Sequence, residues 1–193
     1  MMVPLWLKLA YVLAVLVIVP VYWRHYGPVN FIWLSDIALF CTTLAVVTEN
    51  RLLASMPAVG VLVLELAWTV DFISGGRLLG LTVYMFDGKL PLYLRALSLF
   101  HLALPPTLIW LLWRFGYDER ALLWQGLVTV LAVVAAYIAQ PRENINWVYG
   151  PGSKPQQVLP PLAYVAVEIA VILLCVLVPM HFLLRQVFAV PHR

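Results

Sequence analysis

Charged residues are scarce in this chain, and the scarcity excludes most protein classes. Only 11% of its 193 residues are charged and 64% are hydrophobic, whereas a soluble domain is about 25% charged and about 45–50% apolar. A soluble globular domain, a disordered segment and a coiled coil are therefore all excluded. The chain has only two cysteines, Cys41 and Cys175, and both lie in apolar runs, so a disulfide-built scaffold is excluded too.

Clusters of metal-binding or basic residues are also missing. The sequence contains no CxxC and no HExxH motif, so we expect no metal site and no cofactor. Basic residues are scattered singly between apolar runs, whereas nucleic-acid binding needs them gathered on one face. We therefore expect no nucleic-acid partner.

Long apolar runs are abundant instead, and they predict an all-α polytopic membrane bundle. A transmembrane helix needs about 20 apolar residues, and we predict six such spans in a single transmembrane domain over residues 1–193. The spans are expected at residues 4–23, 29–47, 56–72, 92–113, 121–140 and 162–184. The first is expected to stay in the membrane, because no A-x-A cleavage site follows it. Pro105 and Pro106 predict a kink near the middle of the fourth span.

Two connections between spans stand out. Residues 73–90 are too short and too charged to cross a bilayer, so we predict an interfacial or re-entrant segment there. Residues 141–161 are rich in Pro, Gly and Asn and are longer than most loops, which makes them a candidate functional loop. Backbone N–H groups near its glycines could bind a phosphate or an oxyanion. The loop residues of interest are Asn144, Asn146, Gly150 and Gly152.

The location follows from the spans. Six spans place both termini on one side, and the twelve basic residues divide evenly between the two sides. The free amino terminus then favours termini in the cytoplasm. We expect a multi-pass protein of the cell membrane, in the bacterial inner membrane, with membrane lipids as partners. The sequence indicates no particular partner protein.

Four ionisable residues lie inside predicted spans, where such groups are costly and usually functional. They are Asp36, Glu65, His101 and Glu168. At about 1.5 Å per residue, all four lie about 8–13 Å below the surface opposite the termini, which predicts one polar pocket open to that side. Helical spacing adds lining residues on the same faces, and Asp71 lies at the rim. These further pocket residues are Trp33, Ser98, Tyr164 and Asp71. The alternative is that the carboxyl groups only form hydrogen bonds between helices.

Four segments resemble a known family. They are WLSDIALF at 33–40, LSLFH at 97–101, NINWVYGPGSKP at 144–155 and LPPLAYVAVE at 159–168. In this order they resemble the YwaF-type bacterial integral membrane proteins over residues 30–185, and also an uncharacterised bacterial six-span membrane family. A eukaryotic relative of the YwaF-type proteins is a lipid acyltransferase that uses a Cys and a His. The resemblance places that His at His101 and that Cys at Ser35, with a further family His replaced by Trp33.

The resemblance implies an acyltransferase or hydrolase that acts on lipid esters. Ser35 would be the nucleophile, His101 the base, and Asp36 or Glu168 the group that orients the imidazole. Serine is a weaker nucleophile than a thiolate and needs such a base. Two other functions stay open: a proton-coupled small-solute transporter that uses the intramembrane ionisable groups as a relay, and a non-catalytic accessory protein that binds a lipid or a partner.

Overall fold

The computed structural model describes residues 2–139, 144–151 and 155–189, and these contain helices, turns and loops without a strand. The α-helices are α1 (Leu5–Tyr26), α2 (Leu34–Thr48), α3 (Arg51–Ile73), α4 (Val83–Phe86), α5 (Leu92–Leu97), α6 (Phe100–Phe115), α7 (Ala121–Ala139), α8 (Pro161–Val171) and α9 (Val178–Val187). Two 3-10 helices, η1 (Pro28–Ile32) and η2 (Ile145–Trp147), and a π-helix, η3 (Ile172–Leu177), complete the described elements. The predicted all-α membrane bundle is confirmed.

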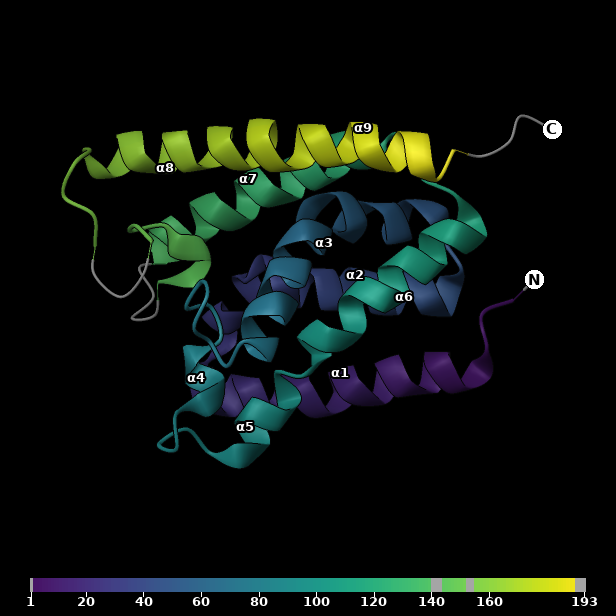
Figure 1. Cartoon of the computed structure of the whole chain (residues 1–193), viewed down its shortest axis with the longest axis horizontal. Helices are drawn as coiled ribbons and strands as arrows, with labels where there is room; N and C mark the ends of the chain where they lie inside the picture. The colour runs from purple at the N-terminus through teal and green to yellow at the C-terminus, as the bar shows by residue number, and fades with distance from the viewer. Residues whose placement is uncertain (1, 140–143, 152–154, 190–193) are drawn as a thin grey trace.

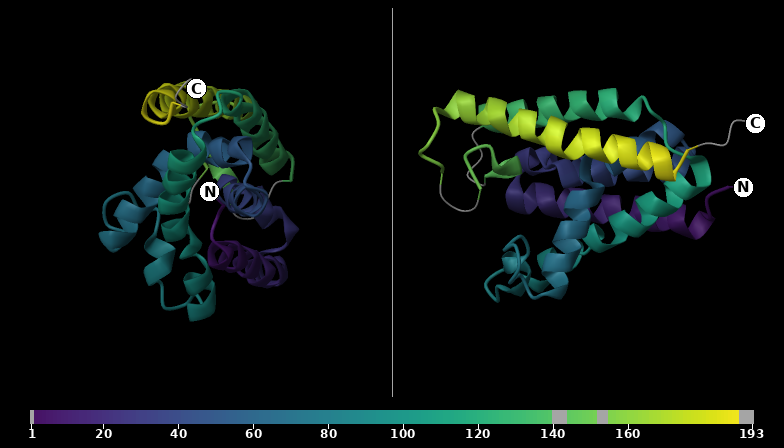
Figure 2. Two further views of the ribbon diagram at one scale, coloured as in Figure 1. Left: turned by 90° about the vertical axis from the view of Figure 1, so that its right-hand side faces the viewer. Right: turned by 45° about the horizontal axis from the view of Figure 1, so that its top comes forward.

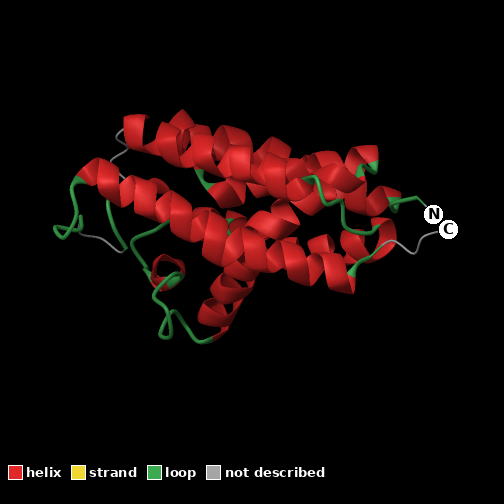
Figure 3. Ribbon diagram, turned by 90° about the horizontal axis from the view of Figure 1, so that it is seen from above, coloured by secondary structure: helices red, strands yellow, loops and turns green. Residues whose placement is uncertain are grey.

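The long helices form a multi-pass membrane bundle. Five segments of the described chain are long and apolar enough to cross a bilayer, namely α1, α3, α5–α6, α7 and α8–α9, and α2 is a shorter apolar helix. Helix α1 begins and α9 ends at the same end of the bundle (Figure 1). Figure 3 shows the long helices running roughly along one direction. Large apolar side chains such as Trp6, Leu131 and Leu174 are exposed on the outside, as a surface in contact with lipid requires.

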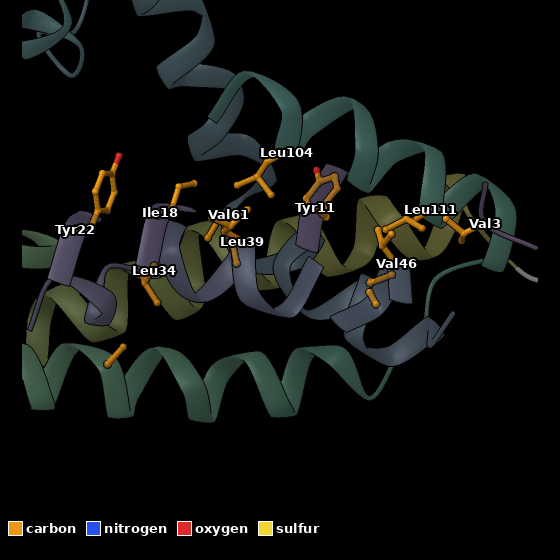
Figure 4. Close-up of a cluster of buried hydrophobic side chains, with 14 of the residues drawn as sticks. Val3, Tyr11, Ile18, Tyr22, Leu34, Leu39, Val46, Val61, Leu104 and Leu111 are labelled. Carbon is orange, nitrogen blue, oxygen red and sulfur yellow. The ribbon is translucent and has the colours of Figure 1, made fainter. Parts of the chain in front are cut away.

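Helix α3 is the centre of the bundle. It packs against α2, α6 and α7, and small residues such as Ala54 and Ala58 on its buried face let the neighbouring backbones approach closely. Gly60 is required to be small, because a Cβ there would lie 2.6 Å from the side-chain amide nitrogen of Gln125 in α7. Helix α1 joins this core through a row of buried side chains that includes Tyr11 and Ile18 (Figure 4).

The second predicted span is wrong as a single helix over residues 29–47. The chain instead forms η1, turns at Trp33 and starts α2 at Leu34. Asn146 explains the break, because its Oδ1 accepts from the backbone N–H of Leu34 at 3.0 Å and its Nδ2 donates to the carbonyl of Ile32 at 2.9 Å. A side chain from a distant loop therefore caps α2 and compensates the polar groups that the break exposes.

The fourth predicted span also breaks in an unexpected place. Helix α6 runs through Pro105 and Pro106, and the break lies about two turns earlier, at Ser98 and Leu99. The physical reason is that a proline lacks the N–H that would bond the carbonyl four residues before it, so the helix loosens on its N-terminal side. There the backbone takes tighter bonds, from His101 N–H to the Ser98 carbonyl and from Leu102 N–H to the Leu99 carbonyl. The kink is thus displaced from the middle of the predicted span to Ser98 and Leu99, just before His101.

The remaining spans differ less from their predicted bounds. Helix α3 begins about one turn before the expected start, because the side chain of Asn50 caps it by accepting from Leu53 N–H. In the last span, the wider turns of η3 precede Pro179, whose missing N–H leaves the carbonyl of Cys175 without its α-helical donor. Helices α7 and α8–α9 lie side by side along one flank of the bundle (Figure 2).

Candidate functional site

A cavity of about 810 Å³ lies in the half of the bundle opposite the start of α1 and the end of α9. Its volume is within the range of about 300–1,000 Å³ that is usual for small-molecule sites. The cavity brings together eight of the residues predicted from the sequence as catalytic or pocket residues. They are Trp33, Ser35, Asp36, Glu65, Ser98, His101, Tyr164 and Glu168.

His101 and Glu65 form a hydrogen-bonded pair on the cavity wall. The Nδ1 atom of His101 lies 2.7 Å from Oε2 of Glu65, whose side chain is only 4% exposed. Such a carboxylate holds the proton on Nδ1 and leaves Nε2 as the basic nitrogen. Within the described residues, no hydrogen bond reaches Nε2. The prediction that Asp36 or Glu168 orients His101 is therefore wrong, because Glu65 occupies that position.

The imidazole is also held by aromatic rings. The ring of His101 stacks on Trp68 with 4.6 Å between centroids and on Phe100 with 4.1 Å between centroids. Just before it, the Ser98 hydroxyl lies 3.0 Å from the hydroxyl of Tyr22, which fixes the break between α5 and α6 against α1. The ring plane and the tautomer of His101 are thus both determined by its surroundings.

Asp36 and Glu168 each keep one buried oxygen without a partner among the described residues. Asp36 lies in the first turn of α2, and its Oδ2 accepts from Asn30 Nδ2 at 2.9 Å. In the described part of the chain, Asp36 Oδ1 and Glu168 Oε2 have no hydrogen-bond partner. Leaving a buried polar atom unpaired costs about 1–3 kcal/mol, so these two oxygens are candidates for contact with a ligand.

Ser35 is the second residue of α2 and lies on the wall of the same cavity. Among the described residues, no hydrogen bond joins Ser35 to His101. Catalytic hydrogen bonds are often long without substrate and shorten only when substrate is bound. Ser35 and His101 both line the cavity, so one bound substrate could contact both.

The loop predicted at 141–161 contributes structure to the site. Asn146 caps α2 and, together with Trp147, lines the cavity. Asn144 closes the loop on itself, because its Nδ2 donates to the Gly150 carbonyl at 2.6 Å and its Oδ1 accepts from Tyr149 N–H at 2.9 Å. The prediction of a free amide at Gly150 is wrong, since that N–H donates to the Trp147 carbonyl at 2.8 Å. Gly152 lies outside the described residues.

Asp71 does not line the cavity, contrary to the prediction. Its carboxylate accepts from the backbone N–H groups of Leu78, Leu79, Gly80 and Thr82 and from the Thr82 hydroxyl, at distances of 2.7–3.3 Å. These bonds fold the segment after α3 into a compact loop, from which Leu81, Tyr84 and Leu90 reach the cavity. The segment predicted as interfacial thus forms part of the cavity wall, and Asp71 anchors it.

Sequence reasoning missed Asn30 and Trp68, which hold Asp36 and His101. Trp68 had a signal, because it is three residues after Glu65 and therefore shares its helix face. Asn30 had none, because the break at Trp33 lies between it and Asp36 and destroys any helical spacing.

The fold and the cavity define a multi-pass helical membrane protein with ionisable side chains on the wall of a cavity in the bundle. Comparisons with protein-family models, with curated proteins and with solved structures give no match for this chain. The resemblance to the YwaF-type proteins stays a prediction, and the site itself is the basis on which a function can be proposed.

Proposed function

We propose that this chain is a membrane enzyme that transfers or hydrolyses the acyl group of a lipid ester. The observation that carries the proposal is the Glu65–His101 pair on the cavity wall, because a carboxylate on Nδ1 gives a histidine whose Nε2 can accept and return a proton. Ser35 supplies the hydroxyl nucleophile on the same cavity.

The chemistry proceeds in two steps. The Oγ atom of Ser35 bonds to the acyl carbon while its proton moves to Nε2 of His101. The ester C–O bond then breaks, and Nε2 gives the proton to the oxygen of the departing alcohol. A water molecule or an acceptor alcohol then releases the acyl group. His101 takes its proton, its oxygen bonds to the acyl carbon, the bond between the acyl carbon and Ser35 Oγ breaks, and His101 returns the proton to Oγ.

Three features support a lipid as the substrate. The cavity lies among the membrane-spanning helices and is walled by apolar side chains such as Val61, Leu64 and Val171. The resemblance to the YwaF-type proteins points to the same substrate class. We place the protein in the bacterial inner membrane, with the start of α1 and the end of α9 toward the cytoplasm. Reporter fusions to the two termini test this orientation.

Labelling with a fluorophosphonate tests the proposal. This probe forms a stable bond to an activated serine, and we expect mass spectrometry of the purified protein to find it on Ser35. In His101→Gln, which keeps a hydrogen-bond donor but cannot accept and return a proton near neutral pH, labelling should be about 10²–10⁴-fold slower. Ser35→Ala removes the hydroxyl that is expected to react with the probe. Ser74→Ala removes a serine hydroxyl outside the cavity, so it is the matched control and should label normally.

Two outcomes would overturn the proposed enzymatic activity. One is a wild-type protein that binds no probe at Ser35, and the other is His101→Gln that labels at the wild-type rate with an unchanged melting temperature. Either result would favour a non-catalytic protein that binds a lipid or a partner.

A second candidate is proton-coupled transport of a small solute. It is favoured by the unpaired buried oxygens of Asp36 and Glu168, because carboxyl groups inside a bundle are typical of proton relays. Proton flux into liposomes that depends on Asp36 and Glu168, together with no labelling of Ser35, would support transport over catalysis.

A further inference from the structure

Part of the cavity wall is exposed on the outside of the bundle. Leu64 on α3 and Val167 and Val171 on α8 line the cavity, and yet these side chains are 42%, 48% and 49% exposed. All three lie well inside helices that are long and apolar enough to cross a membrane, so in a bilayer an opening beside them would face the hydrocarbon. The cavity is therefore open sideways between α3 and α8.

Helix packing explains this opening. Helix α3 packs against η3 and α9, whereas α8 packs mainly against α7. The last span thus approaches α3 only in its second half, and its first half leaves a gap beside Leu64. We define the lateral opening by Leu64, Val167 and Val171. An opening lined by apolar side chains at this depth suits an acyl chain, because moving the chain from the bilayer into an apolar cavity costs little free energy.

The polar end of the cavity has an unusual charge pattern. Three carboxyl groups, of Asp36, Glu65 and Glu168, line it, and the described lining includes no Lys or Arg. Among the described lining residues, a phosphate would find no Lys or Arg to compensate its charge. Asp36 Oδ1 and Glu168 Oε2 instead lack a hydrogen-bond donor, and Asp36 is 3% exposed. A ligand that supplies hydroxyl or ammonium donors would satisfy both oxygens.

We propose that the substrate is a lipid that enters sideways from the bilayer through the lateral opening, and that its polar end donates hydrogen bonds and carries no phosphate. The claim that this lipid is a substrate rests on the proposed function. The claim that it binds in the cavity does not. The acyl chain occupies the space beside Leu64 and Val167, and the donor end faces Asp36 and Glu168. The ester between these two ends lies within the cavity that Ser35 and His101 line.

Photo-crosslinking tests the opening without relying on catalysis. The probe is a monoacylglycerol with a diazirine in its acyl chain, added to the full-length protein in phospholipid nanodiscs. We expect crosslinks in the peptides that contain Leu64 and Val167. Leu64→Trp and Val167→Trp should each lower them about tenfold, because an overpacked opening costs about 1–3 kcal/mol. Leu131→Trp, on an exposed face of α7 that does not line the cavity, is the matched control and should crosslink normally.

Competition identifies the polar end. Unlabelled monoacylglycerol, which brings hydroxyls, or a long-chain amine, which brings an ammonium, should displace the probe, and the stronger competitor shows which donor is used. Phosphatidic acid should not displace it. Equal competition by phosphatidic acid would overturn the choice of ligand. Crosslinks spread evenly over α1 and α7, or unchanged in both opening variants, would overturn the lateral entry.

Failure of catalysis is separable from failure of this inference. A protein that crosslinks at the opening but never labels at Ser35 is a lipid binder, and lateral entry survives. Opening variants that lose crosslinking but keep the wild-type melting temperature are folded, so their loss of crosslinking reports the opening itself. If one tryptophan variant does not fold, the other still decides the question.

Discussion

His101 has its role set by three neighbours rather than by its own position. Glu65 holds Nδ1, and Trp68 and Phe100 hold the ring between them. An imidazole constrained in this way presents Nε2 to the cavity in one tautomer. Glu65 therefore acts through His101 and is a positioning residue.

Glu65→Gln tests this positioning role. The amide keeps the size of the side chain but removes the negative charge, so we expect labelling of Ser35 to slow by about 10²–10⁴-fold, in the same range as for His101→Gln. The double variant should be no slower than either single variant, because the two residues act as a unit. Labelling kinetics measure this, with Glu49→Gln, which pairs with Lys8 away from the cavity, as the control. Additive losses would contradict the paired role.

Asp118 stabilises the end of the bundle at which α1 begins and α9 ends. In the connection between α6 and α7, its carboxylate accepts from the backbone and side chain of Arg120 and lies near Arg51, and these contacts hold its pKa below the usual range. A lowered pKa means that this stabilisation is present above the ordinary aspartate pKa of about 3.9 and is lost as the pH falls through the lower folded value.

We expect Asp118→Asn to lower the free energy of unfolding at neutral pH by about 1 kcal/mol, a low value for bonds to a charged group because Arg120 is exposed. The variant should also lose less stability on acidification than the wild type. Unfolding in detergent between about pH 7 and pH 3 measures both effects. Glu119→Gln, an exposed neighbour, is the control, and identical acid curves for wild type and Asp118→Asn would contradict the assignment.

At the scale of elements, the site depends on breaks in helices. The break at Trp33 lets α2 begin at cavity depth, so that Ser35 and Asp36 lie in its first turn. The break at Ser98 and Leu99 turns the chain just before His101. Each break is compensated by a side chain from elsewhere, Asn146 for the first and Tyr22 for the second.

Asn146→Ala tests the first of these breaks. It leaves the N–H of Leu34 and the carbonyl of Ile32 without their partner, which should cost about 1–3 kcal/mol. We expect faster hydrogen exchange at the start of α2 and a lower melting temperature. Asn144→Ala, which removes the bonds of Asn144 to Gly150 and Tyr149 in the same loop, is the comparison and should leave α2 protected. Unchanged exchange at the start of α2 in Asn146→Ala would show that the cap is not needed.

At the scale of the whole molecule, the bundle separates a stable end from a functional end. The cavity and the loops that wall it lie opposite the ends where α1 begins and α9 finishes. The segment between α3 and α5 is folded by Asp71 into a loop at this functional end, and no described helix in it is long enough to cross a bilayer.

Cysteine accessibility tests this arrangement. In a background without Cys41 and Cys175, Ser74→Cys and Pro91→Cys should both react with a membrane-impermeant maleimide from the same side of the membrane. Glu119→Cys, in the connection between α6 and α7, should react only from the other side. Labelling of positions 74 and 91 from opposite sides would mean that the segment between them crosses the bilayer.

The amino-acid sequence is sufficient to assign the class of this protein and the depth of its site. Apolar run lengths identify the membrane spans, and a helix rises by a constant amount per residue, so spacing alone places Asp36, Glu65, His101 and Glu168 at one depth. Which of these groups meet follows instead from the packing of the bundle, because partner choice depends on how each helix is rotated about its own axis and on where it breaks. Glu65 pairs with His101 because α3 and α6 pack against each other, and Asn146 caps α2 from a residue more than a hundred positions away. Contacts of that kind leave no periodic signal in one sequence, since they depend on packing between helices and not on spacing within one.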